Sequence, residues 1–139
     1  IGTALDSSFH DPWAWMPYAD TESVLGGLHV RGVAVGVVSN TGWNVRTPFE
    51  VRGYDAWIRS FTLSYECGVA KPDVAIFQEA CRQLGVEPNR AIMVGDDARA
   101  DPGAIDAGLV DVILVDPATP IGHHHGLDQA IRRVDESRR

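Results

Sequence analysis

The chain has 139 residues, of which 45% are hydrophobic and 22% charged, a balance that suits one globular domain with a substantial core. Its net charge of −7 at pH 7 argues against a nucleic-acid partner. No apolar run has membrane-spanning length, and Cys67 and Cys81 form neither a disulfide framework nor a common metal motif. We therefore expect a cytoplasmic protein with reduced thiols and no contact with a membrane.

Residues 1–20 are aromatic and rich in turn formers, and the first residue is Ile rather than Met, so we expect that an upstream portion has been lost. Trp13 and Trp15 in this stretch fit a hydrophobic plug on the domain, or a specificity pocket. The three adjacent histidines at 123–125 fit a solvated loop, although a metal site or a tag remnant has the same composition.

Between these ends, helix and strand patterns alternate. Short apolar runs predict strands over 33–38, 61–65, 91–94 and 112–115. Amphipathic spacing and capping residues predict helices over 21–31, 44–54, 73–84, 102–107 and 127–134. This alternation specifies a parallel sheet covered by helices, with the loops that follow the strands gathered at one rim.

Three carboxylates follow the strand over 91–94, directly after Gly95. Asp96, Asp97 and Asp101 would repel one another unless a cation neutralised them, and all-oxygen ligands suit a hard ion such as Mg²⁺. The alternative is that they cap turns and helices, for which Asp101 before Pro102 is well placed.

Polar residues also follow two other predicted strands. Ser39, Asn40 and Thr41 could cradle an anion through side chains and backbone N–H groups, or form a plain turn and helix cap. Further on, Pro72 forces Lys71 into an extended conformation at the mouth of the next helix. A lysine is usually a solvated charge, so a functional role requires carboxylates that face it.

Together these stretches resemble the haloacid dehalogenase-like hydrolase superfamily. The matching segments are Val-Val-Ser-Asn ending at Asn40, Gly-Val-Ala-Lys-Pro-Asp ending at Asp73, and Val-Gly-Asp-Asp-Ala-Arg-Ala-Asp ending at Asp101. The likeness covers roughly residues 20–118, and it is specific because three motifs match in order. It implies an α/β fold with a Rossmann-like parallel sheet and helices on both faces.

The resemblance also implies roles in binding a phosphoryl group. Ser39, Asn40, Thr41 and Lys71 would contact the substrate, and Lys71 would neutralise the nucleophile and the phosphoryl oxygens. Ser39, Lys71 and Asp96 would be the catalytic residues of this chain. Such a division of labour suits phosphoryl transfer, which depends chiefly on positioning and charge neutralisation.

For the metal, the resemblance implies Mg²⁺ held by Asp96, directly or through water. Asp97 and Asp101 would complete the metal site, and Asp101 could orient Lys71 instead. Ser39, Lys71 and Asp96 should therefore converge on one cleft.

One part of the family pattern is missing. The family uses an aspartate nucleophile in an Asp-x-Asp motif at the end of a first strand, and Asp6-Ser7-Ser8 does not match it. We therefore interpret residues 1–20 as the tail of a cap and its return linker, and residues 21–139 as a partial core. The resemblance implies that the missing strand lies between those that carry Ser39 and Asp96, and an upstream segment or a second copy would have to supply it.

The resulting hypothesis is a Mg²⁺-dependent phosphatase that acts on a small phosphorylated metabolite through an aspartyl-phosphate, with the nucleophile outside this chain. Two alternatives remain open. A pseudoenzyme or anion-binding module would keep the anion site without chemistry. A 2-haloacid dehalogenase of the same superfamily would use no metal, which the three aspartates disfavour.

Overall fold

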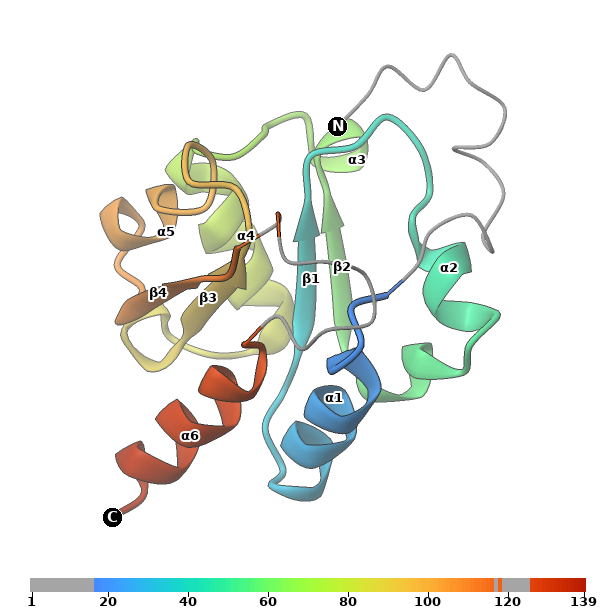
Figure 1. Ribbon diagram of the computed structural model, residues 1–139. Helices are drawn as coiled ribbons and strands as arrows, with labels where there is room; N and C mark the ends of the chain where they lie inside the picture. The colour runs from blue at the N-terminus through green and yellow to red at the C-terminus, as the bar shows by residue number, and fades with distance from the viewer. Residues whose placement is uncertain (1–16, 117, 119–125) are drawn as a thin grey trace.

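A computed structural model describes residues 17–116, 118 and 126–139 (Figure 1). The predictions for Trp13, Trp15, the Asp6-Ser7-Ser8 segment and the histidines at 123–125 lie outside the described residues.

The four predicted strands are present, with ends shifted by a few residues. They are β1 (Gly36–Ser39), β2 (Ser60–Leu63), β3 (Ile92–Gly95) and β4 (Asp111–Leu114). β1 pairs in parallel with β2, and β3 pairs in parallel with β4. In the described part of the chain these pairs form two separate two-stranded sheets, because no ladder joins β1 to β3.

Four of the five predicted helices lie close to their expected positions. The longer ones are α1 (Thr21–Val30), α4 (Val74–Leu84) and α6 (Asp128–Ser137), and α5 (Gly103–Asp106) is a short one. At the start of α4, the Asp73 carboxylate accepts a 2.9 Å hydrogen bond from the Ala75 N–H, and Gly85 ends the helix with φ of 71°. None of the helices in the described residues has the length and apolar character needed to cross a membrane.

Two predicted boundaries are wrong. The helix expected over 44–54 is only α2 (Arg46–Glu50), because Gly53 turns the chain with a φ of 75° before a 3₁₀ helix at Tyr54–Trp57. The strand expected over 61–65 ends at Leu63, and α3 (Ser64–Cys67) begins at the next residue. Ser64 leaves the strand there, and its hydroxyl bonds the backbone of the loop after β1.

Helices cover both faces of the strands, and neighbouring residues of β3 show this directly. Met93 packs against the cluster formed by α4 and α5, whereas Val94 packs against the cluster formed by α1 and α6. In Figure 1, α1 and α6 lie in the lower part of the view, below the strands, and α4 passes behind β3. The buried residues of the α4–α5 cluster are Ile76, Phe77, Cys81, Ala104, Ala107 and Leu109; those of the α1–α6 cluster are Val24, Leu28 and Ala130. The predicted α/β architecture is therefore confirmed.

β1 and β3 are less buried than their apolar sequences predict. Every residue of both strands is only partly buried, although strands inside a parallel sheet are normally covered on both faces. Each has one paired edge, toward β2 or β4, and in the described residues its other edge has no ladder partner. This break lies between the strands that carry Ser39 and Gly95, where the family resemblance places the missing strand.

Candidate active site

The loop after β1 is joined to the segment that carries Lys71. The Asn40 side-chain amide donates to the Lys71 carbonyl oxygen at 3.0 Å, and its oxygen accepts from the Lys71 N–H at 2.7 Å. Ser39, the last residue of β1, precedes Asn40 directly. These two bonds join Asn40 to the Lys71 backbone and place the Lys71 segment beside the end of β1, where Ser39 lies.

Lys71 reaches from this loop to Asp101. Its Nζ lies 2.5 Å from Asp101 Oδ1, with the lysine side chain 11% exposed and the aspartate side chain 1% exposed. A Cβ on Gly95 would lie 1.9 Å from Asp101 Oδ2, so only glycine leaves room for this carboxylate at the end of β3. The facing carboxylate that a functional lysine requires is therefore Asp101.

Asp97 and Asp101 shape the turn after β3. The second oxygen of Asp101 accepts from the Asp97 N–H at 3.0 Å. Asp97 Oδ1 in turn accepts from the N–H groups of Arg99 and Ala100, at 2.9 and 3.0 Å. These backbone hydrogen bonds lower the pKa of Asp97, because they favour its charged form.

Asp96 has a partner that sequence reasoning missed. The Tyr18 hydroxyl donates to Asp96 Oδ2 at 2.5 Å, and 78 positions separate the two residues. Burial is the main reason that the pKa of Tyr18 is raised, and the hydrogen bond to Asp96 raises it further. The phenol therefore stays a hydrogen-bond donor. No local pattern marks Tyr18, because its role depends on the return of the chain to the rim just before α1.

A cavity of about 320 Å³ opens beside this tyrosine. Its lining is mostly apolar and reaches from the start of α1 to α2 and the following 3₁₀ helix, with Asp96 at one wall. The lining residues are Pro17, Tyr18, Thr21, Pro48, Phe49, Arg52, Tyr54 and Asp96.

The three predicted metal ligands face different partners. Asp96 bonds Tyr18, Asp97 caps the turn, and Asp101 pairs with Lys71. Within the described residues, no three His, Cys, Asp or Glu side chains gather as a group that could hold a metal ion. Of the two roles considered for Asp101, the geometry favours orienting Lys71.

Thr41 is hydrogen-bonded to α3 and to its own loop. Its N–H donates to Ser64 Oγ at 2.8 Å, and Ser64 Oγ donates back to the Thr41 carbonyl at 3.0 Å. The Thr41 hydroxyl accepts from the Trp43 N–H and donates to the Trp43 carbonyl. The structure thus gives Thr41 a part in shaping the rim, and its contact with a substrate stays a prediction.

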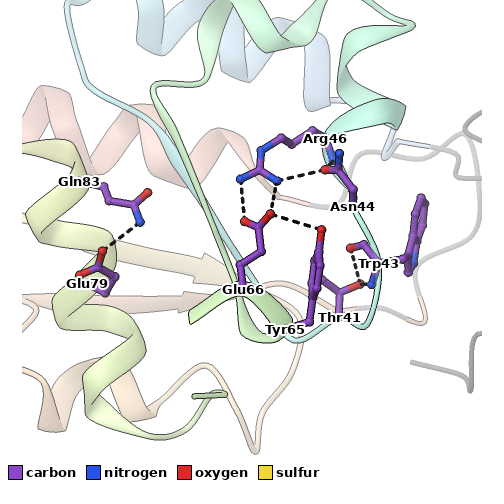
Figure 2. A network of polar contacts seen from close by, with 8 residues as sticks. All are labelled: Thr41, Trp43, Asn44, Arg46, Tyr65, Glu66, Glu79 and Gln83. Atoms are coloured by element: carbon purple, nitrogen blue, oxygen red, sulfur yellow. Dashed lines mark hydrogen bonds and ion pairs between the residues drawn. The ribbon is translucent and has the colours of Figure 1, made fainter. Parts of the chain in front are cut away.

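A network of polar contacts ties this loop to α3 (Figure 2). Arg46 binds the Glu66 carboxylate through two parallel hydrogen bonds of 2.9 and 2.8 Å, and also donates to Asn44 Oδ1. The guanidinium lies 5.5 Å from the centre of the Phe61 ring, and the Tyr65 hydroxyl donates to Glu66. The ends of β1 and β2 are thus linked to each other at the rim.

The Arg46–Glu66 ion pair predicts that part of the protein's stability is lost at low pH. Because Arg46 lowers the pKa of Glu66, the ion pair contributes fully above the ordinary glutamate pKa and is lost as pH falls through the lowered value. We expect Glu66→Gln to lower stability at pH 7 by less than about 1 kcal/mol, since the pair is partly exposed. Urea unfolding at pH 7 and pH 3 measures this, and an equal loss at both pH values would contradict it.

Comparison with known proteins agrees with the motifs. The family model described as haloacid dehalogenase-like hydrolase matches residues 5–108. A glyceraldehyde 3-phosphate phosphatase of Methanothermobacter thermautotrophicus is 31% identical over 121 residues, covering 83% of this chain and 54% of that protein. A protein of the same name from Methanopyrus kandleri is 36% identical over 110 residues, covering 76% and 47%.

A solved structure has a similar fold. The crystal structure of a HAD phosphatase from Thermococcus onnurineus matches with a TM-score of 0.78 at 23% identity, covering 94% of this chain and 65% of that one. The chain spans about half the length of the curated relatives it matches. With the family model covering most of the chain and the three motifs at one rim, the chain belongs to the haloacid dehalogenase-like hydrolases.

Proposed function

We propose that this chain forms the phosphoryl-binding and metal-binding part of a Mg²⁺-dependent phosphatase. The observation that supports it most directly is the buried Lys71–Asp101 pair, tied through Asn40 to the loop beside Ser39. The buried Asp101 carboxylate accepts a hydrogen bond from the Lys71 ammonium and holds it in one position. An ammonium fixed at a strand end is suited to neutralise phosphoryl oxygens, which is most of what phosphoryl transfer requires.

In this proposal each side chain has one task. The Ser39 hydroxyl donates to a phosphoryl oxygen, and Lys71 neutralises the charge on the transferring group and its nucleophile. Asp101 positions Lys71, because its two oxygens bind the Lys71 ammonium and the Asp97 N–H.

Mg²⁺ would be held by Asp96, with Asp97 beside it. Both carboxylates belong to exposed residues at the end of β3, and their hard oxygen atoms fit this ion. The Tyr18 hydroxyl binds one oxygen of Asp96 and so fixes the orientation of the carboxylate. The ion, when bound, supplies charge neutralisation for the transferring group.

The nucleophile would come from a strand that pairs with the open edges of β1 and β3. An aspartate at the end of such a strand would lie at the same rim as Ser39 and Asp96, and its carboxylate would form the aspartyl-phosphate. We propose that an upstream segment of the same protein, or a second copy, supplies this strand. The separation of the described strands into two parallel pairs supports its position.

The substrate in this proposal is a small phosphorylated metabolite. The two relatives named as glyceraldehyde 3-phosphate phosphatases make a triose phosphate the first compound to test. Cys67 and Cys81 are both free thiols, which is consistent with the cytoplasm as the proposed location.

A magnesium titration tests the proposal, using the natural gene product that contains these residues. Ligand binding to the folded state adds about 2.7 kcal/mol of stability when Mg²⁺ is at 100 times its Kd. We expect the melting temperature to rise with Mg²⁺, and hydrolysis of glyceraldehyde 3-phosphate to depend on the ion. Asp96→Asn should remove both effects.

Asp106→Asn is the matched control, because Asp106 is an exposed aspartate of α5. It should behave like the unchanged protein in both assays. A flat thermal titration to tens of millimolar Mg²⁺, the same for Asp96→Asn, would remove the metal role from this chain.

A further inference from the structure

The Asn40 side chain forms hydrogen bonds to the Lys71 backbone like those between neighbouring β-strands. Its carboxamide pairs with both backbone polar groups of one residue, accepting from the Lys71 N–H at 2.7 Å and donating to the Lys71 carbonyl at 3.0 Å. These two residues are 31 positions apart in the sequence. Both polar atoms of the Asn40 side chain therefore face Lys71.

The partners also decide which way the carboxamide points. Turning it over would put its NH₂ group against the Lys71 N–H and its oxygen against the Lys71 carbonyl, which removes both bonds. One orientation is therefore strongly favoured, and it directs the polar atoms of Asn40 at the protein backbone.

We infer that Asn40 is a positioning residue that sets where Lys71 lies relative to the rim of β1, and that it is not a ligand of the substrate. This departs from the role that the family resemblance implies for Asn40. It concerns the position of Lys71, so it can be tested whether or not the proposed phosphatase activity is found.

The other contacts of the Lys71 segment show why the two hydrogen bonds from Asn40 matter for its position. The ammonium is held by Asp101, which belongs to the β3 side of the molecule. The next residue, Pro72, lies against α5 so closely that a Cβ on Gly103 would come 2.4 Å from the Pro72 carbonyl oxygen. Both of these contacts attach the Lys71 segment to the β3–α5 side.

Asn40 attaches the same segment to β1. It follows Ser39 directly, so its two bonds fix the Lys71 backbone relative to the end of β1, which carries Ser39. Without these bonds, Lys71 would keep its ion pair with Asp101, but its backbone would no longer be attached to the end of β1. The expected defect is thus in the joint action of Ser39 and Lys71.

Amide hydrogen exchange, followed by NMR in the natural gene product, tests the structural step. Asn40→Ala should speed exchange of the Lys71 amide by about tenfold or more, the scale expected when a protecting hydrogen bond is lost. Asn40→Asp keeps an acceptor for that N–H, so its Lys71 amide should retain more protection. Unchanged exchange in Asn40→Ala would overturn the inference.

Ser64→Ala is the matched control. The Ser64 hydroxyl also makes two bonds to the backbone of a single residue, Thr41, in the same loop. Its loss should speed exchange at Thr41 and leave Lys71 protected. If both variants speed exchange at both sites equally, the loop loosens as a whole and the specific role of Asn40 is wrong.

Steady-state kinetics with glyceraldehyde 3-phosphate tests the consequence. Asn40→Ala should lower kcat by about 10–100-fold, as losing a supporting residue does, and change KM by less than about threefold. A raised KM with unchanged kcat would make Asn40 a substrate ligand and overturn the inference. If the unchanged protein has no activity, the proposed function fails, and the exchange measurement still decides the role of Asn40.

Discussion

The 139-residue chain, produced alone, is expected not to remain a stable monomer with both strand pairs in place. β1 and β3 each present an edge without a ladder partner in the described residues, and unpaired edges of apolar strands recruit other strands. If β1 and β3 pack together without forming a hydrogen-bonded ladder, their edge N–H and C=O groups become buried without partners. Each such group costs about 1–3 kcal/mol. A few such groups equal the roughly 5–15 kcal/mol that stabilises a whole domain.

Size-exclusion chromatography and intact mass measurement check this expectation. Association, low cooperativity on unfolding, or copurification with a further segment of the protein would agree with it. In the last case the added segment should contain an apolar strand that ends in Asp-x-Asp, and Mg²⁺-dependent phosphatase activity should accompany it. A monomer of 15.1 kDa that unfolds cooperatively would show that the strand is dispensable and would favour a pseudoenzyme.

Asp101→Ala is expected to lower the free energy of unfolding by about 3–5 kcal/mol, the range for breaking a buried ion pair by removing one partner. The reason is the burial of both groups, with side-chain exposures of 1% for Asp101 and 11% for Lys71. The substitution also removes the acceptor for the Asp97 N–H. Urea denaturation of the natural gene product measures the loss.

Two further variants separate the causes. Asp106→Ala removes an exposed carboxylate of α5 and should change stability by less than about 0.5 kcal/mol. Replacing both partners, with Lys71→Met and Asp101→Leu, should recover most of the loss, because no charge then stays buried alone. If the double variant is as unstable as Asp101→Ala, the stranded charge is not the reason for the loss.

The order and type of most elements follow from the sequence alone, because their causes are local. Alternating apolar runs and helical spacing predict the strands and helices, and Asp73 and Gly85 bound α4 as capping residues do. The placement of polar residues directly after strands predicts that Ser39, Lys71 and Asp96 belong to one rim. The family motifs identify the same residues, because the motifs are short and contiguous.

The partners of the site residues were decided only by the tertiary structure. The sequence leaves Asp101 between a metal ligand and an orienting group, and its burial against Lys71 favours the second role. Asn40 faces the Lys71 backbone, and Asp96 accepts from Tyr18, across 31 and 78 positions of sequence. A short polar side chain bonds whatever group the fold brings within about 3 Å, and that distance depends on how separate elements pack, which no local pattern encodes.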